Sequence, residues 1–209
     1  MTQTRANHPN GHLKAKGVAF VAGFVIMAIE LLAARIMAPY LGSSLYTWTA
    51  VIMAVMAGVA LGAWTGGKLA DRKNASRSLA VSLFLSAIFI FLIPIFSEVA
   101  GKALSGNGVS VQILALLFAY IVFFPSSALL GSLTPQLVKR ELKQIQESGS
   151  MYGTISAWNA TGSIAGTYVT GFLFIGYLHV KTAIDLMAGI VFILACIACF
   201  LKTEKDSTI

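Results

Sequence analysis

Residues 17–44, GVAFVAGFVIMAIELLAARIMAPYLGSS, form the stretch that decides the fold class of this chain. An α-helix rises 1.5 Å per residue, so about 20 apolar residues cross a hydrocarbon core of roughly 30 Å. We expect the stretch to be a retained span, since it is too long and lies too deep in the chain for a cleaved signal peptide. With 57% hydrophobic and 11% charged residues, the whole sequence indicates an all-α integral membrane protein.

Glu30 stands out because it is an ionisable residue inside this apolar stretch. It shares a helix face with Gly23 and Met27, small and flexible residues that let another helix approach closely. Two interpretations are open: a carboxylate that binds a cation or proton, or a structural carboxylate hydrogen-bonded to a neighbouring helix. Arg35 lies about 140° further round the helix. It is close enough to the end of the span to reach the membrane interface.

Apolar runs predict six membrane-spanning helices, at residues 17–38, 46–67, 77–97, 110–134, 150–177 and 180–201. We therefore expect a transmembrane domain over residues 17–201 between a flexible tail at 1–16 and a second polar tail at 202–209. Most of the 15 lysine and arginine residues fall on one side if the N-terminus is cytoplasmic. The positive-inside rule then places both termini in the cytoplasm of a cell with a bacterial-type inner membrane.

The net charge of +7 does not indicate a nucleic-acid-binding protein, because the basic residues do not form a face with interleaved aromatic residues. Small residues recur at four-residue intervals in the second and fifth predicted spans, namely at Gly58, Gly62, Gly66, Gly162 and Gly166. Such faces let two helix backbones come together in a membrane. We expect helix packing at both faces, and either is a candidate interface between two copies of the chain.

Hydrogen-bonding side chains follow one face of the fifth predicted span, where Asn159 and Ser163 are candidate ligands for a solute. Asn159 has the alternative role of bridging two helices through a hydrogen bond. The fourth span is interrupted by Pro125 and Pro135, each of which removes a backbone donor and predicts a kink. This kink is either static or a moving part beside a binding site. We expect no metal and no cofactor.

The loop after the second span, GKLADRKNASR at residues 67–77, resembles the cytoplasmic loop signature of the major facilitator superfamily through Gly67, Asp71 and Arg72. Four blocks in order are similar to the membrane domain of the fused major facilitator/spermidine synthase family: ELLAARIMAPYLGSSLYTW, GVALGAWTGGKLADR, PSSALLGSLTPQLVK and SMYGTISAWNATGSIAGTYVTGF. Together they extend over residues 30–172. The resemblance implies half of a major-facilitator-like bundle, which a second copy would complete as a homodimer.

The resemblance implies two functions that involve polyamines. In the first, the protein binds or transports a small cationic metabolite: Glu30 supplies the negative charge, Asn159 and Ser163 supply hydrogen bonds, and the segment between the two prolines acts as a hinge. In the second, the protein is a membrane subunit that docks a separate aminopropyltransferase-like enzyme. We expect no enzymatic activity from residues 1–209, since they contain no glycine-rich strand–turn–helix unit and no acidic cluster in a soluble region.

Overall fold

The computed structural model describes residues 9–71, 75–104, 109–142 and 148–206, which are helical apart from short connections and contain no strand. The elements in chain order are α1 Pro9–Leu41, α2 Leu45–Ala70, α3 Ala75–Leu104, α4 Val111–Val122, α5 Phe124–Gly131, α6 Leu133–Glu141, α7 Ser148–Tyr168, the π-helix η2 Val169–Phe174, α8 Ile175–Tyr177 and α9 Val180–Asp206. Helix α1 begins inside the predicted tail, with a proline in its first turn, where a missing N–H costs nothing. Helix α9 likewise extends into residues 202–206.

Four helices are long and apolar enough to span a membrane, over Leu13–Leu41, Leu45–Ala70, Arg77–Leu104 and Val180–Cys199. A fifth candidate is the bent pair Val111–Val122 and Phe124–Glu141. The chain is therefore built as a multi-pass membrane protein. Six spans are not confirmed, because the predicted span at residues 150–177 forms α7, η2 and α8, which are not among these helices. Its many serine, threonine, asparagine and glycine residues lower its hydropathy.

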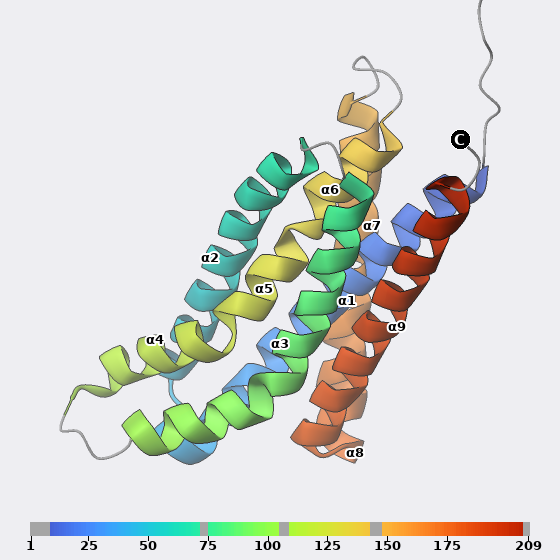
Figure 1. The fold of residues 1–209 in the computed structure, drawn as a ribbon. Helices are drawn as coiled ribbons and strands as arrows, with labels where there is room; N and C mark the ends of the chain where they lie inside the picture. The colour runs from blue at the N-terminus through green and yellow to red at the C-terminus, as the bar shows by residue number, and fades with distance from the viewer. Residues whose placement is uncertain (1–8, 72–74, 105–108, 143–147, 207–209) are drawn as a thin grey trace, which may run out of the picture.

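The helices lie side by side in one bundle (Figure 1). The start of α1 and the end of α9 lie at the same end as the connections from α2 to α3 and from α6 to α7 (Figure 1). Helix α1 packs mainly against α7, α3 against α9, and α2 against α5. The interior of the bundle is apolar, with fully buried side chains from α1, α3 and α4 such as Ile29, Leu32, Ile90 and Phe118.

The bend predicted at Pro125 is present, since the axes of α4 and the following helical segment differ by 49°. The break falls at Phe123, and Pro125 occupies the first turn of α5. The carbonyl of Phe123 accepts a hydrogen bond of 2.9 Å from the hydroxyl of Ser126 and one of 3.1 Å from the backbone N–H of Ser127. Pro135 lies in the first turn of α6, directly after a second break at Ser132.

Candidate functional site

The α1–α7 seam is the line along which these two helices touch, and glycine residues bring their backbones together. A Cβ atom at Gly162 would overlap the backbone of Phe20, and one at Gly166 would overlap the backbone of Phe24. From the first contact to the second, the position in α7 rises from 162 to 166 and that in α1 from 20 to 24, so the two helices run parallel. The contact is close enough that no side chain fits between the backbones at these positions.

Two hydrogen bonds fix the register of the α1–α7 seam. The side-chain amide of Asn159 donates to the carbonyl of Ala19 at 3.2 Å, and the guanidinium of Arg35 donates to the carbonyl of Ile175, also at 3.2 Å. Each bond joins residues that are 140 positions apart in the chain. Glu30 lies between the two bonds, so on this register it is level with Thr170.

Glu30 and the polar residues of α7 also share one side of the seam. Gly23 lies seven residues before Glu30 on the same helix face, and a Cβ atom at Gly23 would meet both Asn159 and the hydroxyl of Ser163. Asn159, Ser163 and Thr170 recur at intervals of four and seven residues, and so share a face of α7 and its π-helical extension. Asn159 and Ser163 therefore lie together beside Gly23, and Glu30 lies on the same face of α1, two helical turns further along.

Two side-chain oxygens at this level are buried without a hydrogen-bond partner among the described residues. They are Oε2 of the half-buried Glu30 and Oγ1 of Thr170, which is fully buried. An unsatisfied polar group away from water costs free energy, and a carboxylate costs more than a hydroxyl. An ionisable residue inside a membrane span is a candidate functional residue, and Glu30 is the one at this level.

Thr170 of η2 differs from the threonines of α7 in the geometry of its backbone. The hydroxyls of Thr161 and Thr167 donate to the carbonyl four residues earlier, at 2.8 and 2.9 Å. Thr170 instead lies in the π-helix, and its carbonyl accepts from the N–H of Ile175, five residues later. π-Helical turns occur frequently at functional sites. The hydroxyl of Thr170 has no hydrogen-bond partner among the described residues, whereas those of Thr161 and Thr167 donate to backbone carbonyls.

The remaining predicted residues lie elsewhere. In the α2–α5 seam, Cβ atoms at Gly58, Gly62 and Gly66 would overlap Ser127, the backbone of Ala128 and Ser132, respectively. Both glycine faces are therefore covered within the chain, so an interface between two copies has to use another surface. Asn159 makes the helix bridge that was one of its two predicted roles.

The predicted loop signature lies at the end of the bundle that carries the chain termini. Asp71 caps α2 and accepts a hydrogen bond of 3.0 Å from Lys139 of α6, in an ion pair whose two side chains are exposed. Gly67 has open space around its Cα atom. Arg72 lies outside the described residues.

Gln136 and Thr170 were not predicted as site residues. Gln136 is fully buried, and its side-chain amide donates to the hydroxyls of Ser82 and Ser132, each at 3.1 Å. Its carbonyl oxygen is buried without a partner among the described residues. Gln136 gave little signal, because it lies in the polar segment LTPQLVKRE, and the signal for Thr170 was its place on the polar face of the fifth span.

Comparison with known proteins does not identify a family for this chain. No family model, no curated protein and no solved structure matches it.

Proposed function

We propose that this protein binds a small cation in the α1–α7 seam and carries it across the membrane, with Glu30 as the counter-charge. One observation carries the proposal: Oε2 of Glu30 and Oγ1 of Thr170 are buried without a hydrogen-bond partner among the described residues, and the register set by the two hydrogen bonds of the seam puts them at about the same level. A carboxylate and a hydroxyl are both acceptors, and an ammonium group offers three N–H donors. A primary ammonium ion therefore supplies what these two oxygens lack.

The rest of the proposal concerns topology and assembly. The basic residues of the described chain are concentrated at the end that holds both termini, which supports an inner-membrane protein with cytoplasmic termini. The bundle is half of a major-facilitator-like transporter, and a second copy supplies the other half through a surface outside the two glycine seams. A polyamine is the substrate class that the sequence resemblance favours.

The test is binding of spermidine to the purified protein, read as a rise in unfolding temperature. A ligand that binds only the folded state stabilises it by about 2.7 kcal/mol at a concentration 100 times its Kd. We expect a rise for the wild type and none for Glu30→Gln, which keeps the size of the side chain and removes its charge. The matched control is Glu98→Gln, because Glu98 is an exposed carboxylate already paired with Lys102 on the surface.

The outcomes separate clearly. A rise that Glu98→Gln retains and Glu30→Gln loses supports the α1–α7 seam as the cation site and justifies uptake measurements in vesicles. An equal rise for wild type and Glu30→Gln would remove Glu30 from the site. If neither protein responds to spermidine or to shorter diamines, the proposal of a polyamine ligand is wrong.

A further inference from the structure

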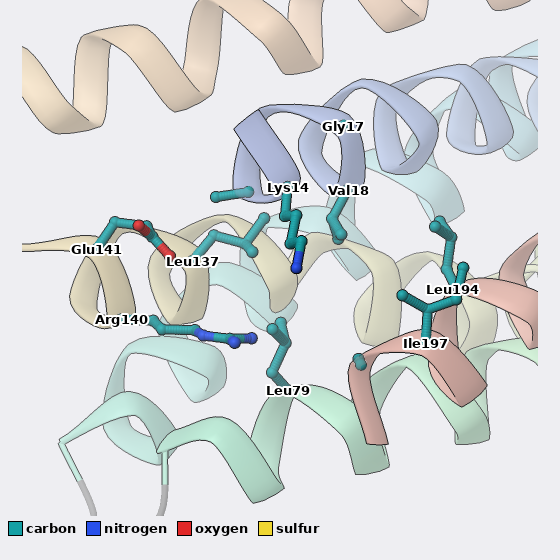
Figure 2. Close-up of a pocket in the computed structure, with 11 residues that line it drawn as sticks. Lys14, Gly17, Val18, Leu79, Leu137, Arg140, Glu141, Leu194 and Ile197 are labelled. Carbon is teal, nitrogen blue, oxygen red and sulfur yellow. The ribbon is translucent and has the colours of Figure 1, made fainter. Parts of the chain in front are cut away.

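A second candidate site lies at the end of the bundle that carries the chain termini, well away from Glu30. A cavity of about 230 Å³ opens there between α1, α3, α6 and α9 (Figure 2). Its walls are mostly apolar, with contributions from Val18, Leu79, Leu137, Leu194 and Ile197. The cavity is smaller than the roughly 300–1,000 Å³ of a typical small-molecule site. It suits the end of a flexible apolar chain better than a whole ligand.

The mouth of the cavity carries two cations. Lys14 and Arg140 both line it, and Figure 2 shows their charged ends directed toward the same space beside Leu79. Neither has an ion-pair partner among the described residues. Glu141 also borders the cavity, but its carboxylate lies beyond Leu137 as seen from Lys14, and it has an interaction of its own (Figure 2). The mouth therefore favours an anion.

The depth of the cavity matches the boundary between hydrocarbon and headgroups. Lys14 and Leu79 lie in the first turns of the candidate spans Leu13–Leu41 and Arg77–Leu104, and Ile197 lies in the last turn of Val180–Cys199. Arg140 lies in the last turn of the bent span. Basic pockets between membrane helices at this depth bind lipid headgroups. Anionic lipids are concentrated in the cytoplasmic leaflet, which is the side that the positive-inside rule assigns to this end.

We propose that this cavity holds part of one acyl chain of an anionic phospholipid, whose phosphate lies between Lys14 and Arg140. The occupant explains both properties of the cavity at once: apolar walls for the chain and two cations for the headgroup. Arg140 forms paired hydrogen bonds with phosphate oxygens, and Lys14 adds a mobile point charge. The lipid would join α1, α6 and α9, which meet at this end of the bundle.

The test compares the unfolding temperature of the delipidated protein after addition of phosphatidylglycerol or phosphatidylcholine in mixed micelles. Each basic residue near an anionic surface changes affinity by about fivefold. The double variant Lys14→Gln/Arg140→Gln is therefore expected to bind phosphatidylglycerol at least about tenfold more weakly than the wild type. Lys181→Gln is the matched control, since it removes one exposed lysine at the opposite end of the bundle.

Two further arms identify the source of the phosphate and the role of the walls. Ala198→Leu reduces the cavity without changing its charge, and is expected to weaken binding of phosphatidylglycerol as well. Inorganic phosphate alone is expected to give no comparable shift. The proposal is overturned if the double variant keeps the full response to phosphatidylglycerol, if Ala198→Leu keeps it, or if inorganic phosphate reproduces it. Unfolding in phosphatidylcholine verifies that each variant is folded.

Discussion

The α1–α7 and α2–α5 seams use the same packing device and differ in what they do with polar groups. In each, glycines four residues apart bring two helix backbones into contact. In the α2–α5 seam, the hydroxyls of Ser126 and Ser132 donate to the carbonyls of Phe123 and Leu129 at 2.9 and 2.7 Å. In the α1–α7 seam, Oε2 of Glu30 and Oγ1 of Thr170 have no hydrogen-bond partner among the described residues.

The difference shows that close packing and the pairing of polar groups are separate properties of a membrane helix pair. A seam whose polar groups satisfy the backbone beside them contributes stability alone. A seam that leaves acceptors unpaired loses stability, and this loss is recovered only when a ligand supplies the missing donors. Adding a methyl group at a glycine of the α2–α5 seam should therefore lower stability, whereas removing the unpartnered hydroxyl of Thr170 from the α1–α7 seam should raise it.

The largest effect is expected from Gly62→Ala in the α2–α5 seam. The new methyl group would overlap the carbonyl of Ala128, a backbone atom that cannot turn aside. Overpacking of this kind costs about 1–3 kcal/mol, and sometimes more. Thermal unfolding in detergent measures the loss.

Gly67→Ala is the control for this substitution, since it lies on the same helix and a Cβ atom there meets nothing within 4 Å. It should raise stability by about 0.5–1 kcal/mol through helix propensity. If Gly62→Ala were as stable as Gly67→Ala, the backbone contact in this seam would not exist.

A smaller effect of opposite sign is expected from Thr170→Val in the α1–α7 seam. Valine has nearly the same shape and lacks the unpartnered hydroxyl, so stability should rise by about 1 kcal/mol while spermidine binding falls. Thr167→Val is the matched control, because its hydroxyl is exposed and already bonded to Ser163. Its stability should change by less than about 0.5 kcal/mol. A loss of stability in Thr170→Val would show that the hydroxyl has a partner after all.

The smallest effect is expected at the edge of the α2–α5 seam, where Asp71 pairs with Lys139. Both side chains are more than half exposed, at 71% and 51%. A double-mutant cycle with Asp71→Asn and Lys139→Gln should give a coupling energy of about 0.2–1 kcal/mol, which falls as salt is added. A coupling energy well above this range would mean that the pair locks α2 to α6.

Much of the architecture follows from local sequence patterns. Hydropathy predicts the helices because a long apolar run in a membrane has to pair its backbone N–H and C=O groups within the segment, and an α-helix does this. The bend at Pro125 follows from the missing N–H, and the glycine spacing indicates which faces pack closely. These signals lie within single helices.

The partners of these faces do not follow from the same patterns. The four-residue spacing of the glycines does not indicate that Gly62 contacts Ala128, or that Gly162 contacts Phe20. The π-helix at Thr170 is equally hidden, because its sequence, VTGFLF, contains one glycine and no pattern that specifies a hydrogen bond to the fifth residue. The number of spans is hard to predict for a related reason. Residues 150–177 carry polar side chains on the face that packs against α1, and these lower the mean hydropathy of a segment that packs along α1.

The π-helix affects how this part of the chain responds to the deletion of one residue. A turn closed by a bond to the fifth residue holds one residue more than an α-helical turn, so this segment tolerates the loss of one residue without a break in its backbone hydrogen bonds. Such a deletion would, however, turn every later side chain of the helix by about 100°. The carbonyl of Ile175 would then leave the guanidinium of Arg35. The bond between Asn159 and Ala19 lies before the π-helix, so the deletion is expected to leave it in place and to separate the two ends of the α1–α7 seam.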